Sequence, residues 1–146
     1  MPLRLALDGW DMVTPSACRA EINALHEFFV AWFDGSVPRR KLSRLERALA
    51  PEFEMVTTEG ERVDHAALVD GLAESYGRTE GESFDIEVRD VEALGLFEDH
   101  AVVRYEEWQR RGEEDTGRVS MALFRGDADA PEGVVWVTLQ ETALEG

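Results

Sequence analysis

SFDIEVRDVEALGL, at residues 83–96, is the first of four long segments that decide the fold. It is followed by AVVRYEEWQR (101–110), GRVSMALFR (117–125) and VVWVTLQETA (134–143), with short polar or glycine-bearing connections between them. These segments are rich in Val, Leu, Phe and Trp, which favour β-strands. Connections this short join neighbouring strands in antiparallel order. The sequence therefore predicts an antiparallel meander of four long strands.

A long amphipathic helix is predicted upstream of these strands. Thr14 is a suitable N-cap, Pro15 suits the first helical position, and Gly35 ends the helix. Apolar side chains recur on one face at helical spacing, which predicts that this face packs against the sheet. That face carries Cys18, Ile22, Leu25, Phe29, Trp32 and Phe33.

Two further helices and a short strand pair are predicted between the first helix and the long strands. The second helix is expected from Arg39 to Ala50, where Pro51 would stop it. Residues 52–63 read as a strand pair that turns at Glu59-Gly60, and a third helix is expected from the Asp64 cap to about Gly77. Helices grouped before an antiparallel sheet are typical of the α+β class.

The bulk composition indicates one domain. The chain has 146 residues, 44% of them hydrophobic, and is interpreted as a single domain over residues 1–146, with residues 1–13 as a possible N-terminal arm. A formal net charge of −16 argues against nucleic acid and anionic membranes as partners. Cys18 is the only cysteine, so no internal disulfide forms, and no leader or membrane-length apolar run is apparent. We therefore expect a cytoplasmic protein.

Three stretches resemble the nuclear transport factor 2-like (NTF2-like, cystatin-like) superfamily, and within it the SnoaL-like and steroid delta-isomerase-like branch. They are the aromatic first helix at residues 21–32, the segment LAPEFEMV (49–56) with the helix that follows it, and the closing strand WVTLQET (136–142). The resemblance implies a curved sheet wrapped around three helices to form a cone with a pocket, often as a homodimer. Members include isomerases, dehydratases, cyclases and hydrolases of small hydrophobic molecules, and others only bind ligands. The final strand often carries histidines where this chain has Gln140 and Thr142.

Three residues are candidates for catalysis. His65 lies in the first turn of the third helix, where the helix N-terminus disfavours imidazolium and favours a neutral base; the alternative is a histidine that packs beside the cap. Tyr76 is placed on the apolar side of the same helix. Glu106 alternates with Arg104 on one strand face, as a ligand-polarising pair or as a cross-strand salt bridge in water.

The expected ligand-binding wall is aromatic with one cation. It consists of Phe29, Trp32, Tyr76, Arg104 and Trp136. His26 flanks the apolar face of the first helix and is interpreted as a rim or interface residue. Four carboxylates that could supply a base are interpreted as surface charge: Asp90, Glu92, Glu107 and Glu141. No metal-binding or cofactor-binding motif is found, so no metal and no cofactor are expected.

Three functions remain open. The first is a domain that binds a small hydrophobic ligand in the cone, and the second is a cofactor-free isomerase, dehydratase or hydrolase of a small hydrophobic substrate. The third is a structural or regulatory homodimer without a pocket. A homodimer through the outer sheet face is expected in any case, because residues 119–124 and 134–139 are apolar on both alternating faces while three helices cover only one face.

Overall fold

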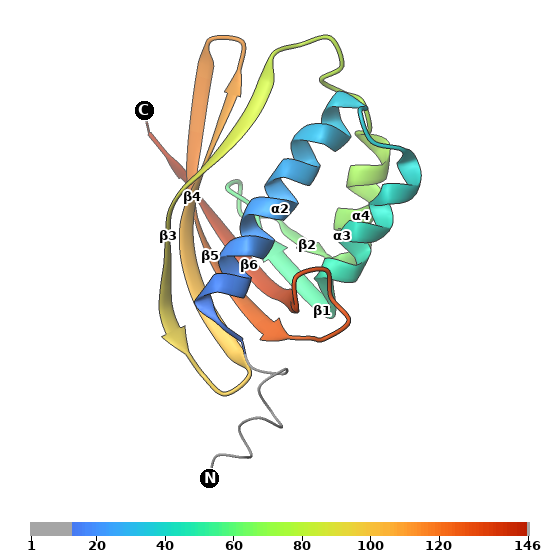
Figure 1. Cartoon of the computed structure of the whole chain (residues 1–146). Helices are drawn as coiled ribbons and strands as arrows, with labels where there is room; N and C mark the ends of the chain where they lie inside the picture. The colour runs from blue at the N-terminus through green and yellow to red at the C-terminus, as the bar shows by residue number, and fades with distance from the viewer. Residues whose placement is uncertain (1–12, 146) are drawn as a thin grey trace.

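The computed structural model describes residues 13–145 and shows a helical layer cradled by a curved sheet (Figure 1). Nearly all of the possible arm at residues 1–13 therefore lies outside the described residues. The helical elements are α2 (Pro15–Asp34), the 3-10 helix η2 (Arg39–Leu42), α3 (Ser43–Ala48) and α4 (His65–Glu74). The strands are β1 (Leu49–Val56), β2 (Arg62–Asp64), β3 (Phe84–Leu96), β4 (His100–Arg111), β5 (Glu114–Gly126) and β6 (Val134–Leu144).

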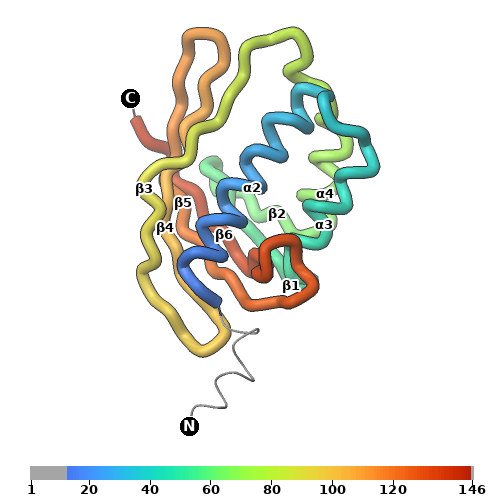
Figure 2. The backbone as a smooth tube through the Cα atoms, in the orientation of Figure 1, coloured from blue at the N-terminus to red at the C-terminus, as the bar shows by residue number. Residues whose placement is uncertain are grey.

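The six strands form one sheet in the order β2-β1-β6-β5-β4-β3. The four long strands are antiparallel, as predicted, and the short pair β1–β2 is antiparallel as well. The pair joins the meander through β1, which runs parallel to β6, so the sheet is mixed and does not close on itself. The trace in Figure 2 shows how the long strands bend around α2. This confirms the α+β class and the curved sheet packed on three helices.

Local signals fix the ends of α2. The Thr14 hydroxyl accepts a hydrogen bond of 3.0 Å from the Ala17 N–H, and Gly35 ends the helix in the left-handed region at a φ of 75°. The predicted apolar face is buried: Ile22 and Trp32 are fully buried, and Trp32 packs against Tyr76 and donates to the Leu72 carbonyl of α4. The helix therefore lies across the concave side of the sheet with its aromatic face inward.

The second helix differs from the prediction. A 3-10 turn and a six-residue helix replace one helix over residues 39–50, and Leu49 already belongs to β1, where it pairs with Trp136 of β6. Pairing with a distant strand outweighs the local helical pattern here. Pro51 does not stop a helix but lies inside β1, where the β1–β6 register is irregular and a missing N–H is tolerated.

Buried aromatic and ionic contacts hold the helices on the sheet. The core is built around the fully buried Trp32, Phe53, Tyr105, Phe124 and Trp136. Glu21 of α2 is also fully buried; it accepts two hydrogen bonds of 2.9 Å from Arg44 and one of 2.8 Å from the Trp136 indole. No helix within residues 13–145 is long and apolar enough to cross a membrane.

Candidate functional site

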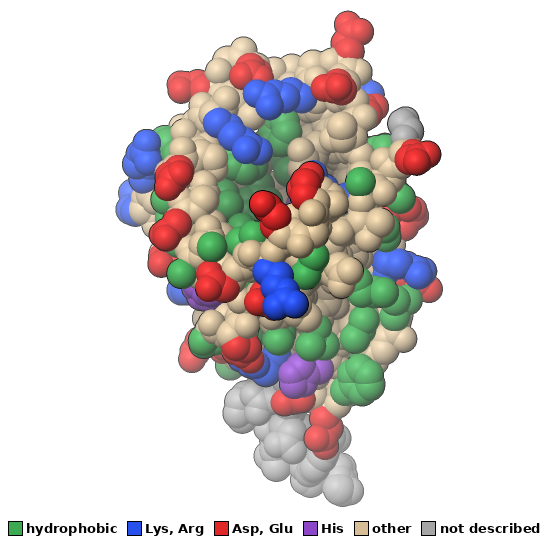
Figure 3. Space-filling model, turned by 180° about the vertical axis from the view of Figure 1, so that it is seen from behind, with side chains coloured by type: hydrophobic (Ala, Val, Ile, Leu, Met, Phe, Trp, Pro, Cys, Tyr) green, Lys and Arg blue, Asp and Glu red, His purple; other side chains and the backbone are tan. Residues whose placement is uncertain are grey.

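A cavity of about 340 Å³ lies between α2 and the concave face of the sheet. The space-filling view in Figure 3 shows a hollow on one face of the molecule, with hydrophobic side chains in its depth and charged side chains around it. The apolar wall comes from α2, β1, β4 and β6, because these elements turn their inward positions toward one another. Its larger members are Phe29, Phe33, Phe53, Tyr105, Trp136 and Leu139.

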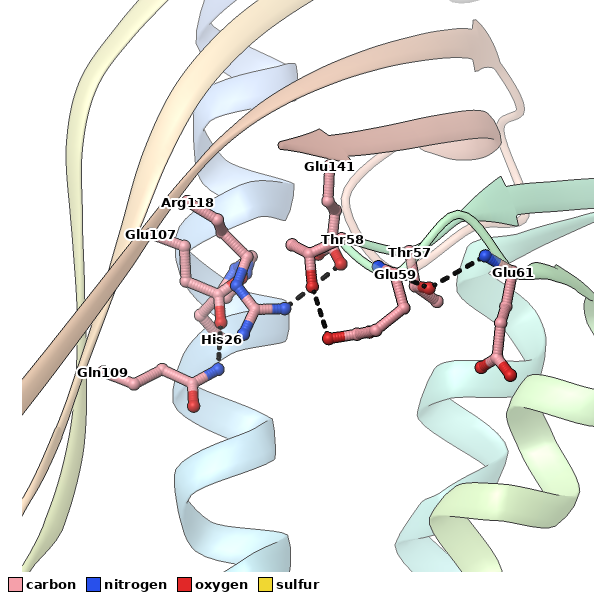
Figure 4. A network of polar contacts seen from close by, with 9 residues as sticks. All are labelled: His26, Thr57, Thr58, Glu59, Glu61, Glu107, Gln109, Arg118 and Glu141. Carbon is pink, nitrogen blue, oxygen red and sulfur yellow. Dashed lines mark hydrogen bonds and ion pairs between the residues drawn. The ribbon is translucent and has the colours of Figure 1, made fainter. Parts of the chain in front are cut away.

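One end of the cavity is polar. Strand alternation places Glu107 and Gln109 on the same inward face of β4 as the buried Tyr105. Arg118 is the cross-strand partner of Glu107 on β5, and Glu141 lies on the neighbouring strand β6. Figure 4 shows these side chains gathered close to His26 of α2. Four elements therefore contribute polar groups to one region of an otherwise apolar cavity.

His26 and Glu107 form a buried pair. The Nε2 atom of His26 lies 3.0 Å from Oε1 of Glu107, and the two side chains are 4% and 7% exposed. The Nδ1 atom of His26 lies 2.7 Å from the Ile22 carbonyl oxygen. Because a carbonyl oxygen only accepts, Nδ1 carries a proton, and a second proton must lie between Nε2 and Glu107.

The pKa values place that second proton on the histidine. Burial opposes charge on His26, but the hydrogen bond and negative charge of Glu107 outweigh it, and the pKa of His26 is raised. Burial alone would raise the pKa of Glu107. The hydrogen bond and positive charge of His26, together with the hydrogen bond from Gln109, outweigh burial and lower this pKa. The Gln109 amide donates to the other Glu107 oxygen at 2.6 Å. The pair thus consists of an imidazolium and a carboxylate, and each group provides the hydrogen-bond partner and the opposite charge that the other needs in the interior.

Arg118 and Glu141 form a second ion pair, in which fewer of the hydrogen-bonding groups have partners. The Nη1 atom of Arg118 donates to Oε1 of Glu141 at 3.1 Å, and the two side chains are 26% and 8% exposed. Burial raises the pKa of Glu141, Arg118 opposes that rise, and the negative charge of Glu107 adds to it. Within residues 13–145, Oε2 of Glu141 accepts no hydrogen bond. Glu141 therefore presents an open acceptor next to the remaining N–H groups of Arg118.

The mouth of the cavity is built by the turn between β1 and β2. Thr57 and Thr58 are half-buried and Glu59 is exposed, and all three line the cavity. The Thr57 hydroxyl accepts hydrogen bonds from the backbone N–H groups of Glu59 and Glu61, and the Thr58 hydroxyl donates to the Glu59 carboxylate at 3.0 Å. These bonds hold the turn in place beside Glu141 (Figure 4).

Two of the expected wall residues line the cavity, Phe29 and Trp136. Trp32 and Tyr76 do not, because both are used in packing behind the wall. The Trp32 indole donates to the Leu72 carbonyl oxygen at 2.7 Å and packs edge-on against Tyr76. The Tyr76 hydroxyl donates to the Val37 carbonyl oxygen at 2.6 Å.

The remaining candidates lie outside the cavity. His65 uses Nδ1 in a 3.0 Å hydrogen bond with the Ala50 carbonyl oxygen, beside a separate surface hollow. Arg104 forms an exposed cross-strand ion pair with Glu92 at 2.8 Å, on the outer face of the sheet. Glu106 shares that face and accepts a hydrogen bond from the Trp108 indole. His65, Tyr76 and Glu106 therefore do not converge.

The polar groups that do meet differ from the candidates that the sequence pattern indicates. The pattern predicts a rim or interface position for His26 and surface positions for Glu107 and Glu141, but the structure buries all three side chains in the cavity. A signal for Glu107 was present, since it shares strand parity with Val103 and Tyr105, whose side chains are inward. Within residues 13–145, no group of three or more His, Cys, Asp or Glu side chains is arranged to hold a metal ion.

Comparison with known proteins gives a family and a fold. A family model described as the sucrose-6-phosphate phosphohydrolase C-terminal domain matches residues 19–145. An NTF2-like protein of unknown function from Pseudomonas aeruginosa is 28% identical, with 88% of this chain and 99% of that chain covered and a TM-score of 0.80. No curated protein matches the sequence.

More distant solved structures share the fold. An NTF2-like protein of unknown function in nutrient uptake from Rhodospirillum rubrum is 17% identical, with 84% of this chain and 98% of that chain covered and a TM-score of 0.60. An uncharacterized protein with a cystatin-like fold from Caulobacter vibrioides is 13% identical, with 89% of each chain covered and a TM-score of 0.63. These likenesses confirm the resemblance to the NTF2-like superfamily at the level of the fold.

Proposed function

Because the chain belongs to the family of the sucrose-6-phosphate phosphohydrolase C-terminal domain and has the NTF2-like fold, we propose that its cavity binds one small, mainly apolar molecule. The observation that carries this proposal is the cavity itself. Its volume of about 340 Å³ falls within the range of about 300–1,000 Å³ that is usual for small-molecule sites. An apolar wall with a few polar groups gathered at one end is the usual composition of such sites.

The apolar wall supplies the affinity in this proposal. Side chains such as Phe29, Phe53 and Trp136 already border the hollow, so a ligand removes their remaining apolar surface from water together with its own. Burial of apolar surface contributes about 25 cal/mol per Å². A ligand of about ten carbon atoms therefore gains enough from this wall to bind without a strong charge–charge contact.

A sugar phosphate, the substrate in the family's description, fits this cavity poorly. Phosphate recognition uses arginine or lysine groups that are free to donate to its oxygens. In the depth of the cavity Arg118 is paired with Glu141 and His26 with Glu107, so a phosphate that enters there meets two carboxylates beside two cations that are already paired; Arg78, which also lines the cavity, is exposed to water and stacked on Phe33. The proposed ligand is therefore an apolar molecule rather than a phosphorylated sugar.

Native mass spectrometry of the purified protein tests the proposal, followed by titration with the neutral probe N-phenyl-1-naphthylamine. We expect a retained molecule or saturable probe binding at one site per chain. Val63→Phe, at the cavity wall on β2, should weaken binding, whereas Val102→Phe, the same change on the outer sheet face, should not. Absence of saturable binding to the wild-type protein would rule the proposal out.

A cofactor-free acid–base enzyme is a second candidate, and Glu141 favours it. A carboxyl group with a raised pKa and an open oxygen in an apolar cavity is suited to take up or deliver a proton. The probe 5-nitrobenzisoxazole reports such a base, because removal of its ring C–H proton breaks the N–O bond and releases a coloured cyanophenolate. We expect acceleration that Glu141→Gln abolishes and Arg110→Gln, at an exposed ion pair, leaves unchanged. Equal rates for wild type and Glu141→Gln would remove this candidate.

A structural homodimer with a filled core is the function that the cavity disfavours. An unfilled volume beside buried charged groups reduces stability, and a purely structural domain gains nothing from it.

A further inference from the structure

The ionisable groups inside the cavity are paired with one another, and from this we propose that the ligand is uncharged and carries a hydroxyl or carbonyl group that binds Arg118 and Glu141. This inference rests on the proposed ligand-binding function and names the chemical class of the ligand. It follows from three features: the balance of charge in the cavity, the saturation of one ion pair, and the open hydrogen-bonding groups of the other.

The charges in the depth of the cavity balance. His26 and Arg118 supply two positive charges, and Glu107 and Glu141 supply two negative ones, at contact distances of 3.0 and 3.1 Å. Two further charged residues line the cavity, Glu59 and Arg78, and both are exposed to water. Arg78 stacks on the Phe33 ring at 4.0 Å, and Glu59 is held by Thr58. No uncompensated charge therefore lies in the depth of the cavity.

A charged ligand would have to break one of these pairs. An anion that takes Arg118 leaves the Glu141 carboxylate, which is 8% exposed, without its partner. A cation that takes Glu141 places its own positive charge beside the Arg118 guanidinium, which is 26% exposed and has lost its partner. Either ion also loses its own hydration on entry, and a buried charge without a partner is strongly unfavourable. An uncharged ligand avoids both losses.

The polar group of the ligand is directed to Arg118 and Glu141 because every nitrogen and oxygen of the His26–Glu107 pair already has a hydrogen-bond partner. Both nitrogens of His26 are engaged, and both oxygens of Glu107 are engaged by His26 and Gln109. Arg118 uses one N–H toward Glu141 and has others left, and Oε2 of Glu141 accepts nothing within residues 13–145. A hydroxyl group can accept from the first and donate to the second, and a carbonyl group can accept from Arg118.

Four probes of similar size separate these possibilities: 2-phenylethanol, 2-phenylethylammonium, phenylacetate and ethylbenzene. We expect 2-phenylethanol to bind at least about tenfold more tightly than either ion, as followed by chemical-shift changes of the cavity methyl groups of Leu68 and Leu139. It should also bind more tightly than ethylbenzene, which lacks the polar group. An ion that binds as tightly as the alcohol would overturn the inference.

Two substitutions in the Arg118–Glu141 pair should shift the binding preference from the uncharged probe toward a charged one. Glu141→Gln removes the carboxylate that engages Arg118, so phenylacetate should gain about tenfold relative to 2-phenylethanol. Arg118→Gln should give the same gain to 2-phenylethylammonium. Arg110→Gln, at an exposed ion pair with Asp115, is the matched control and should change neither ratio. Unchanged ratios in both cavity variants would contradict the assignment.

The two proposals fail in different ways. If ethylbenzene and 2-phenylethanol both fail to bind, the cavity is not a site for apolar molecules, and both proposals are wrong. If ethylbenzene binds and the alcohol has no advantage over it, the proposed function stands and the inference about Arg118 and Glu141 is wrong.

Discussion

His26 of α2 and Glu107 of β4 are hydrogen-bonded at 3.0 Å in the interior, although 81 positions separate them in the sequence. The contact joins the long helix to the middle of the curved sheet at the polar end of the cavity. Because Nδ1 of His26 is also bonded to the Ile22 carbonyl oxygen, the imidazole ring is fixed at both nitrogens. The pair therefore acts as a rigid, ionised part of the wall.

The first prediction concerns the protonation of His26. Glu107 raises the pKa of His26 above the ordinary value of 6.5 in spite of burial. With Glu107→Gln the charge that supports imidazolium is lost and burial remains, so the pKa of His26 should fall below 6.5. NMR titration of the His26 ring protons measures both values. A pKa at or below 6.5 in the wild-type protein would show that the pair is not ionised as described.

The second prediction is the pH range over which this pair stabilises the fold. Glu107 has a lowered pKa when folded, so its contribution is present above its ordinary value of 4.5 and is lost as pH falls toward about 2. His26 has a raised pKa when folded, so its contribution is present below 6.5 and is lost as pH rises through the raised value. The loss of stability in Glu107→Gln should thus be largest between pH 4.5 and 6.5, at about 3 kcal/mol. Urea unfolding across pH measures it, and a loss that grows steadily up to pH 9 would contradict it.

The third prediction concerns the buried anchor at Glu21. Glu21→Leu leaves the Arg44 guanidinium and the Trp136 indole N–H without their shared acceptor, and should lower the free energy of unfolding by about 3 kcal/mol. The matched control is Asp115→Leu, which removes the acceptor of the exposed Arg110 and should change the free energy of unfolding much less. Similar losses in the two variants would show that the anchor is not a major support of the fold.

How much the sequence predicts depends on how local each interaction is. The caps of α2 at Thr14 and Gly35 form hydrogen bonds with residues only a few positions away in the chain, so both can be predicted from the sequence. The parallel pairing of Leu49 with Trp136 joins distant segments, and nothing near Leu49 indicates it. The same holds for the site. Alternation along β4 can place Glu107 inward, but its pairing with His26 depends on the angle at which α2 crosses the sheet.

The fourth prediction is the homodimer. The outer face of β4, β5 and β6 carries a shallow hollow lined in part by Val102, Val119, Met121 and Leu123, and Met121 is 44% exposed. Because no element of residues 13–145 covers this face, we expect a second copy of the chain there. Light scattering should give twice the 16.4 kDa of one chain, and Met121→Glu should reduce the mass to that of one chain. A wild-type mass of 16.4 kDa at both low and high salt would contradict it.

The fifth prediction compares the effects of Glu141 and Glu107 on the stability of the fold. Burial and the charge of Glu107 raise the pKa of Glu141 above 4.5, and Arg118 does not fully compensate. A carboxyl group with a raised folded pKa favours the fold while it is protonated, and this contribution is lost as pH rises through the raised value. At pH 7 the ionised Glu141 therefore lowers stability, as is common for groups retained for function.

Glu141→Gln should accordingly stabilise the protein at pH 7, by about 1 kcal/mol, because the amide keeps the shape and removes the buried charge. Arg118 loses its partner, but its side chain is 26% exposed and remains hydrated. The gain should vanish below pH 4.5, where the wild-type carboxyl group is itself protonated. Glu107→Gln, the same chemical change in the same cavity, should destabilise the protein in the acidic range where the ion pair is complete. Thermal unfolding of the two variants at pH 4, 6 and 7 distinguishes these effects, and a Glu141→Gln variant that melts below the wild-type protein at pH 7 would show that Arg118 fully compensates the Glu141 charge.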